Sequence, residues 1–395
     1  SSSSRGLGDV YKRQGFISAV VRKDDGAWSK PCHMHPALAA FVFPRGNLAV
    51  RNRTVLAAMT NKQSHPDGSV STDEIRWLEA RAEGGFGIVT TAATHVLEHG
   101  QGWEGEFGTW SDHHIEGLTA MATAIRGHGA VGLAQLFHGG MRAPQRLTGV
   151  RPCSASENDL GGDLGNSKAY SIEEIHEVIQ AFGAAAERCE QAGFHGVELH
   201  GAHGYLIAQF LGRGTNRRTD GWGGDQTERT RFLRAIVDEV RRRTGPTFLV
   251  GVRLSPQLTA CGLTIEDSLK TLGLCNAMPL DFVHVSCWDI AETTRIDGRD
   301  VPFTTVFRTH LNDEIPLFTT GSVWNAGDAT EAVQQGAEFV GVGRAGIAHP
   351  DWPLYLENAQ DEPKRPPFSV SELEAASLNP TFIEYMRRWK GFVEP

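Results

Sequence analysis

Short apolar segments alternate with longer amphipathic segments along the chain from about residue 51 onward. Most of the short segments are unbroken runs of β-branched and other apolar residues, a pattern typical of parallel strands that are covered on both faces. The pattern predicts strands at 54–58, 87–91, 131–136, 196–200, 248–254, 282–286, 316–320 and 339–342.

The amphipathic segments carry apolar residues at helical spacing, and several begin at capping sequences. Ser71 and Thr72 are cap candidates for one helix, and residues 171–174 form a capping box for another. Further helices are predicted at 171–191, 226–243, 265–276 and 325–335. Eight strands alternating with helices predict an α/β protein, a single-domain (β/α)8 TIM barrel with inserted βα loops. A doubly wound parallel sheet is the alternative.

Polar or small residues follow the predicted strands. They include Met59, Thr60, Gln135, His200, Arg253, Gly321, Ser322, Gly343 and Arg344. In a closed barrel all carboxyl ends of the strands meet on one face, where barrel enzymes place their chemistry. The convergence of these residues therefore favours the barrel over the open sheet.

Composition narrows the class of protein. The chain has 395 residues and a net charge of −9, which argues against nucleic-acid and anionic-membrane partners. No apolar run approaches the roughly 18–20 residues that span a bilayer. The six cysteines form no CxxC pair, so neither a disulfide framework nor a zinc ribbon is indicated. We therefore expect a cytoplasmic enzyme.

The first residues do not share the pattern of the rest. Residues 9–14, DVYKRQ, resemble a translated transposon-end adapter, and we expect residues 1–33 to be a non-native or disordered leader. The predicted barrel then occupies residues 34–362, and residues 363–395 form a C-terminal tail with a helix.

The strand at 196–200 runs into the most informative cluster of side chains. His200 and His203 are separated by the small residues Gly201 and Ala202, which would leave space above a flat ligand. Two imidazoles in one pocket can donate hydrogen bonds to a single oxygen and stabilise developing negative charge. The phenol of Tyr205 can deliver a proton. The alternative is that both histidines are structural, but two histidines and a tyrosine within six residues favour a catalytic role.

These residues also carry a family resemblance. The segment HGAHGYLIAQFL at 200–211, with RNRTVLAAMTN at 51–61, GLAQLFHGG at 132–140 and VGVRLSP at 250–256, resembles the Old Yellow Enzyme family of flavin-dependent ene-reductases. The resemblance covers about residues 41–353. It implies an FMN-binding (β/α)8 barrel that oxidises NAD(P)H and reduces the activated C=C bond of α,β-unsaturated carbonyl compounds in two alternating half-reactions.

The resemblance also implies a role for each matching residue. His200 and His203 would bind the carbonyl oxygen of the substrate, and Tyr205 would protonate Cα. FMN would contact Ala58, Met59, Thr60, Ala93, Gln135, Arg253, Gly321, Ser322, Gly343 and Arg344. Of these, the last four would hold the phosphate, and Arg253 would lie beside N1 and O2 of the flavin.

Some positions depart from the family pattern. Ala58 replaces a common proline, Ala92 a frequent glutamate and Trp222 a frequent tyrosine. The Gly140-Met141 pair before Arg142 looks inserted, which leaves the role of that arginine open. Trp103, Trp288 and Trp324 either shape the substrate pocket or serve in packing.

The sequence indicates no metal site and leaves the oligomeric state and two alternative functions open. The histidines outside the 200–205 cluster have no spacing that compels a metal site, and no metal is expected. No cysteine follows Cys287, so the iron–sulfur cluster of larger relatives is not expected, and electrons would come from diffusible NAD(P)H. A homo-oligomer is left open. A flavin-free phosphate-binding lyase or isomerase and a non-catalytic flavin-binding scaffold are the alternative functions.

Overall fold

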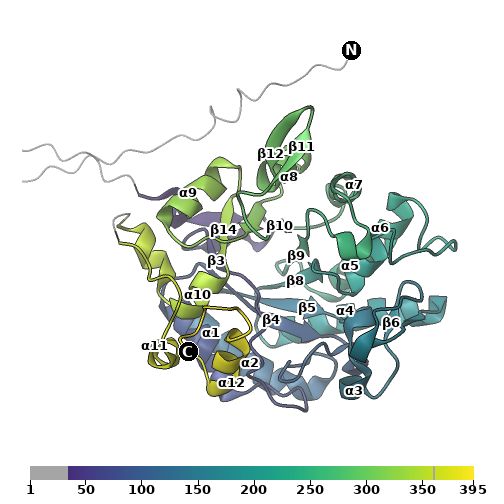
Figure 1. Cartoon of the computed structure of the whole chain (residues 1–395), viewed down its shortest axis with the longest axis horizontal. Helices are drawn as coiled ribbons and strands as arrows, with labels where there is room; N and C mark the ends of the chain where they lie inside the picture. Colours follow the sequence, from purple (N-terminus) through teal and green to yellow (C-terminus); the bar gives the residue numbers. More distant parts are fainter. Residues whose placement is uncertain (1–33, 359–360) are drawn as a thin grey trace, which may run out of the picture.

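The computed structural model describes residues 34–358 and 361–395, and its centre is a closed barrel of eight parallel strands (Figure 1). All eight predicted strands are present, and closure of the sheet excludes the doubly wound alternative. The residues of the predicted leader lie outside the described part. In order around the barrel the strands are β3 (Thr54–Leu56), β4 (Ile88–His95), β5 (Val131–Phe137), β8 (Gly196–Gly201), β9 (Leu249–Leu254), β10 (Phe282–Ser286), β13 (Leu317–Thr320) and β14 (Phe339–Val342).

Helices follow the barrel strands and cover their outer faces. The predicted capping box at Ser171 is confirmed, and Ser71 rather than Thr72 caps the first helix. The α-helices are α1 (Thr72–Glu83), α2 (Ile115–Gly127), α3 (Gln145–Thr148), α4 (Ile172–Gln191), α5 (Leu206–Leu211), α6 (Gln226–Arg243), α7 (Ile265–Cys275), α8 (Phe303–His310), α9 (Ala326–Gln334), α10 (Arg344–Ala348), α11 (Val370–Ala375) and α12 (Pro380–Met386). Within the described ranges, none of them is both long and apolar enough to cross a bilayer.

A hairpin that the sequence pattern did not predict closes the amino end of the barrel. It consists of β1 (Phe41–Phe43) and β2 (Leu48–Val50). The ring of Phe43 stacks on Phe339 at 5.6 Å, and Phe318 stacks on Phe282 at 4.4 Å. Buried aromatic rings fill this end, so ligand chemistry is left to the opposite end.

Two further small sheets lie outside the barrel. They are β6 (Cys153–Ser154) with β7 (Lys168–Ala169), and β11 (Thr293–Ile296) with β12 (Arg299–Pro302). Figure 1 shows the second pair as a hairpin that projects away from the barrel. Both belong to inserted βα loops.

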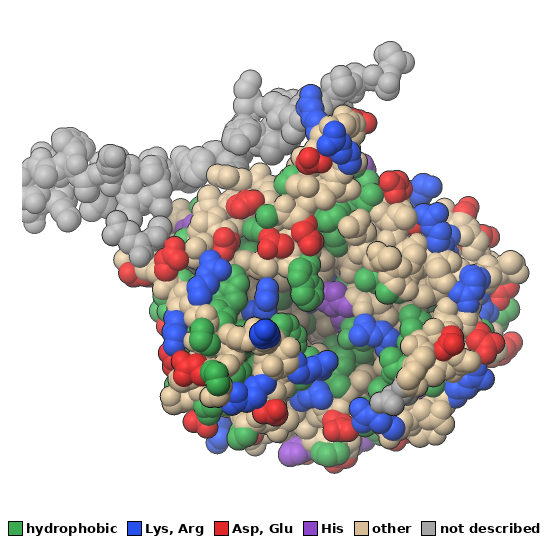
Figure 2. Space-filling model, viewed as in Figure 1, with side chains coloured by type: hydrophobic (Ala, Val, Ile, Leu, Met, Phe, Trp, Pro, Cys, Tyr) green, Lys and Arg blue, Asp and Glu red, His purple; other side chains and the backbone are tan. Residues whose placement is uncertain are grey.

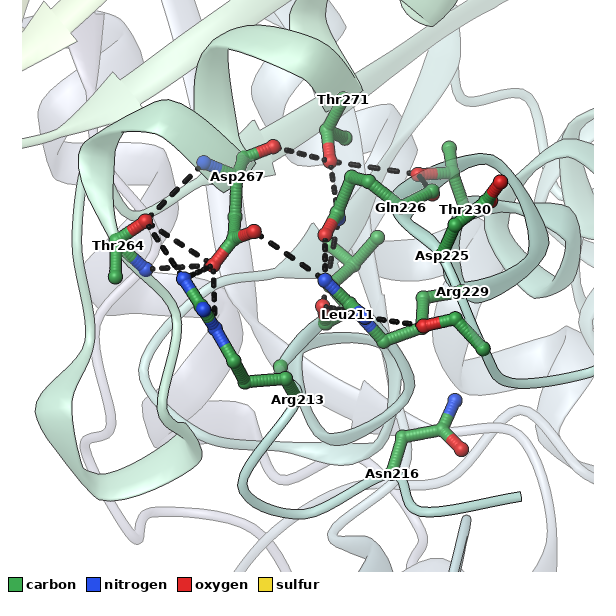
Figure 3. A network of polar contacts seen from close by, with 12 residues as sticks. Leu211, Arg213, Asn216, Asp225, Gln226, Arg229, Thr230, Thr264, Asp267 and Thr271 are labelled. Carbon is green, nitrogen blue, oxygen red and sulfur yellow. Dashed lines mark hydrogen bonds and ion pairs between the residues drawn. The ribbon is translucent and has the colours of Figure 1, made fainter. Parts of the chain in front are cut away.

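A network of charged groups fixes the segment after α5 (Figure 3). The carboxylate of Asp267 on α7 accepts from Arg213 at 2.9 Å and from Arg229 of α6 at 3.2 Å. Arg229 also donates through Nε to the carbonyl oxygen of Leu211, the last residue of α5. Because α5 begins directly after Tyr205, this network anchors the element that follows the predicted catalytic cluster.

The C-terminal segment packs back onto the first helix of the barrel. Phe382 of α12 meets the ring of Trp77 on α1 edge-on at 5.6 Å. The fully buried Arg81 of α1 donates to the carbonyl oxygens of Gly346, Ile347 and Ala376. These bonds hold residues that are 265 to 295 positions apart in one layer, and they place α12 near the carboxyl end of the barrel.

Candidate active site

A cavity of about 190 Å³ opens at the carboxyl end of the barrel. Figure 2 shows it as a hollow in which histidine side chains are visible. Nine of the thirteen predicted site residues line this cavity: Ala58, Met59, Thr60, Ala93, Gln135, His200, His203, Tyr205 and Arg344. The strand ends therefore bring together residues that are up to 286 positions apart in the sequence.

The two histidines at the end of β8 are held as neutral rings. The N–H of Ala202 donates to Nδ1 of His200 at 3.3 Å, so the proton of the neutral ring is on Nε2. Burial, with the neighbouring positive groups, holds the pKa of both His200 and His203 well below the usual value. The ring centroids are 5.0 Å apart. Neutral imidazoles of this kind can donate hydrogen bonds without carrying a full charge.

His203 is fixed by contacts with two neighbouring strands. Its backbone has φ +58°, a left-handed conformation that costs a non-glycine residue free energy. Its N–H donates to the hydroxyl of Ser255, and its Nε2 lies 2.7 Å from the hydroxyl oxygen of Ser286. The first bond fixes the backbone of His203, and the second fixes the orientation of its ring.

Tyr205 stands at the N-cap position of α5 and packs among rings. Its ring meets Phe137 edge-on at 4.5 Å and His200 at 5.0 Å. Burial raises the pKa of Tyr205, although the nearby Arg142 opposes that shift. The phenol therefore keeps its proton throughout the neutral range and is available as a proton donor.

The structure brings Arg142, whose role the sequence left open, into this cluster. Its guanidinium carbon lies 4.6 Å from the centre of the Tyr205 ring. Its Nη1 donates to the carbonyl oxygen of His203 at 2.6 Å. The inserted-looking Gly140-Met141 pair thus does not separate the arginine from Tyr205 and His203.

Below the cavity a buried hydrogen-bond network orients Gln135. Nε2 of Gln135 donates to Glu198 at 2.7 Å. No described residue donates to the side-chain oxygen Oε1 of Gln135, which is left for a ligand. The other oxygen of Glu198 lies 2.7 Å from Nδ1 of His284, whose Nε2 lies 2.6 Å from the Thr320 hydroxyl. Burial alone would raise the pKa of Glu198, but His284 and Arg253 hold it below the usual value. Glu198 is thus a carboxylate that receives a proton donor on each oxygen.

Arg253 does not line the cavity but lies directly behind its wall. It is 5% exposed, and its Nη1 donates to the carbonyl oxygen of Ala58 at 3.1 Å. Its Nε is buried without a partner in the described part of the chain. A buried guanidinium with an unused donor fits an electron-rich ring edge.

The residues predicted for the phosphate come together after β13 and β14. Nη2 of Arg344 donates to the Ser322 hydroxyl at 3.2 Å, and that hydroxyl donates to the carbonyl oxygen of Trp288. Ser322 has φ +51°, and a Cβ added at Gly343 would find open space apart from Met59 at 3.9 Å. Of the four predicted phosphate residues, only Arg344 also lines the main cavity.

One wall of the cavity comes from residues that the sequence did not indicate. Tyr385, Met386 and Trp389, in and after α12, line it together with Ile347. Their positions follow from the packing of α12 on α1, for which the local sequence carries no signal.

The three tryptophans have different environments. Trp103 lines the cavity and contacts Tyr205, with ring centroids 6.3 Å apart. Trp288 is 75% exposed, and Trp324 is buried against Trp352 and Arg365, so these two do not line the cavity.

The expected reason for a small residue at position 201 was wrong. A Cβ at Gly201 would lie 2.9 Å from the carbonyl oxygen of Arg253 and 3.0 Å from Leu254. The glycine therefore permits close approach of β8 and β9, rather than leaving space for a ligand.

A closed parallel barrel with this cluster at its carboxyl end has the arrangement of barrel enzymes, which place their chemistry on that face. The family model described as NADH:flavin oxidoreductase / NADH oxidase matches residues 43–362. The chain belongs to this family, that of the Old Yellow Enzymes.

Several named proteins are similar to the chain. It is 33% identical over 334 residues to a probable NADH-dependent flavin oxidoreductase of Bacillus subtilis, covering 83% of this chain and 89% of that protein. It is 32% identical to NADH:fumarate oxidoreductase of Klebsiella pneumoniae, covering 80% of this chain but 35% of that longer protein. Morphinone reductase in complex with tetrahydroNAD superposes with a TM-score of 0.75 at 25% identity, covering 87% of this chain and 96% of that one.

Proposed function

We propose that the protein reduces the activated C=C bond of α,β-unsaturated carbonyl compounds at the expense of NAD(P)H. The observation that carries this proposal is one cavity in which two neutral histidines and a protonated tyrosine face the residues predicted to hold FMN. NAD(P)H would be oxidised in the first half-reaction and the alkene reduced in the second.

In the second half-reaction the histidines bind the carbonyl oxygen. Nε2–H of His200 donates to that oxygen, and His203 supplies the second hydrogen bond. Both donors are neutral and fixed, so they stabilise the negative charge that develops on the oxygen without reorganising. The result is an alkene polarised toward hydride addition at Cβ, with FMN, when bound, supplying the hydride.

Tyr205 delivers the proton that completes the addition. Its hydroxyl hydrogen passes to Cα, and the positive potential of Arg142 stabilises the tyrosinate that is left. Water then restores the proton to Tyr205.

The remaining residues would hold the cofactor. Ala58, Met59, Thr60 and Ala93 would border its ring, and Gln135 and Arg253 would provide polar contacts. Gly321, Ser322, Gly343 and Arg344 would hold the phosphate. The free carbonyl oxygen of Gln135 and the unpartnered Nε of Arg253 support this assignment.

Anaerobic spectroscopy of the purified protein tests the proposal. We expect a flavin band, its bleaching by NAD(P)H and its recovery on addition of an enone. A His200→Ala/His203→Ala enzyme should lose far more of the recovery rate than of the bleaching rate; equal losses would contradict the assignment. A colourless protein that binds no FMN would favour a barrel lyase or isomerase. A flavin that no alkene reoxidises would favour a non-catalytic scaffold.

A further inference from the structure

Three positively charged side chains surround the two tyrosines of the cavity. The Arg142 guanidinium lies over Tyr205, while Nζ of Lys62 and the guanidinium of Arg388 lie 5.5 Å and 5.3 Å from the centre of the Tyr385 ring. Both tyrosines line the cavity. The mouth of the site therefore has a positive potential.

None of these three cations has a carboxylate partner among the residues that the structure describes. Neighbouring arginines behave differently: Arg146 pairs with Glu104 at 2.8 Å and Arg387 pairs with Glu384 at 3.2 Å. An unpaired guanidinium beside a cavity is available for an anion, because its donors match carboxylate oxygens.

A buried carboxylate on the loop that carries Trp103 has other partners. Glu106 lies 3.2 Å from Nδ1 of His95 and accepts from the N–H groups of Gly102 and Trp103. No ion pair joins it to Arg142, so the donors of that guanidinium are not used by this loop.

Arg142 has hydrogen-bond donors that are not used within the described part of the chain. Its Nη1 is committed to the carbonyl oxygen of His203, whereas its Nε and Nη2 bond no other described residue. The interior wall, by contrast, is apolar and aromatic, with Trp103, Ile347, Met386 and Trp389. A ligand that fits both parts has an apolar body and an anionic group directed to the mouth.

We propose that the substrate of this site is an α,β-unsaturated carbonyl compound that also carries a carboxylate, bound by Arg142 at the mouth, with Lys62 and Arg388 adding to the attraction. This inference rests on the proposed ene-reductase function. It narrows the substrate class from enones in general to unsaturated oxo acids.

A matched pair of probes isolates the charge. The substrates are 4-oxopent-2-enoate and its methyl ester, which share the enone and differ by one negative charge. For the FMN-loaded wild-type enzyme we expect a higher kcat/KM for the acid than for the ester. In Arg142→Gln the ratio of kcat/KM for the acid to kcat/KM for the ester should fall about tenfold. This is the effect expected from the loss of one hydrogen bond to a charged group.

Two further variants serve as controls. Arg142→Lys keeps the charge and should restore part of the ratio. Arg146→Gln removes an exposed arginine of the same loop that is already paired, and it should leave the ratio within about twofold, because exposed ion pairs contribute little. The flavin spectrum of each variant reports whether the barrel and cofactor site are intact.

Two outcomes would overturn the inference. The first is an unchanged acid-to-ester ratio in Arg142→Gln; if the KM for NAD(P)H also rises, the cations act on the reductant instead. Reduction of the ester would then still support the ene-reductase function. If the wild-type flavin is bleached by NAD(P)H but neither probe reoxidises it, the proposed function itself fails, and this inference fails with it.

Discussion

The hydroxyl oxygen of Ser286, at the end of β10, lies 2.7 Å from Nε2 of His203, in the loop that follows β8. Together with the bond from the His203 N–H to Ser255, this contact holds a ring whose backbone has a left-handed conformation. The position of His203, the second of the two histidines proposed to bind the carbonyl oxygen, therefore depends on a side chain two strands away around the barrel.

Replacing Ser286 by alanine should weaken enone reduction. Loss of one hydrogen bond that orients His203 predicts a fall in kcat/KM for an enone of about fivefold. The rate of flavin bleaching by NAD(P)H should change less, and Ser286→Thr, which keeps the hydroxyl, should recover part of the loss. Stopped-flow measurement of the two half-reactions checks this, and an equal loss in both would show that Ser286 acts on the flavin rather than on His203.

Replacing Tyr205 by phenylalanine removes the proposed proton donor while keeping the ring that packs on Phe137. General acid catalysis is worth about a hundredfold or more, so the rate of flavin reoxidation by an enone should fall by about that factor. Bleaching by NAD(P)H should be nearly unaffected. Undiminished reoxidation would remove Tyr205 from the mechanism.

Replacing Glu198 by glutamine breaks the buried network beneath the cavity. It removes the charged acceptor of the hydrogen bonds with Gln135 and His284, and a hydrogen bond to a charged group typically contributes about 1.5–3 kcal/mol. We expect a comparable drop in the free energy of unfolding, measured by urea denaturation, and weaker FMN binding through Gln135. Glu177→Gln, an exposed position on α4, is the control and should change neither quantity.

The raised pKa of Glu74 should make the free energy of unfolding depend on pH. This fully buried carboxyl group accepts from Asn61 at 2.6 Å, but burial raises its pKa to about 7. Between its unfolded value of 4.5 and 7, the folded state binds more protons than the unfolded state, so the free energy of unfolding falls as pH rises through this window.

The size of that fall follows from the two pKa values. A difference of about 2.5 units corresponds to about 3 kcal/mol. In urea unfolding of the FMN-saturated protein at pH 5 and pH 8, wild type should lose about this much more stability than Glu74→Gln does. Glu83→Gln, at an exposed position on the same helix, should follow wild type, and parallel profiles for wild type and Glu74→Gln would contradict the assignment.

Much of the fold was predictable from the sequence because the signals are local. A buried parallel strand such as β9 is an unbroken apolar run, and the polar residue at its end, Arg253, marks the face where the strands converge. A helix cap such as Ser171 can also be recognised from four consecutive residues. The eight strands, and the polar residues that follow them, were predicted from these signals.

The remainder depends on contacts between residues far apart in the sequence. The bond from Gln135 to Glu198 requires the register between β5 and β8, and the contact of Glu198 with His284 spans the barrel interior. The position of Arg142 depends on the path of a loop, and that of Tyr385 on the packing of α12 against α1. Apolar runs and spacing contain no information about any of these relationships.

The wall formed by Tyr385, Met386 and Trp389 has a consequence for how the enzyme can diversify. The residues proposed to polarise the alkene and donate the proton lie at the end of β8 and in the loop after it, in contact with neighbouring strands. Those of this wall lie in a peripheral helix, beyond the eighth barrel strand, and can change without altering the register of any strand. This wall and the proposed catalytic cluster are thus encoded in separate stretches of the gene, so the shape of the cavity can change while the cluster is kept.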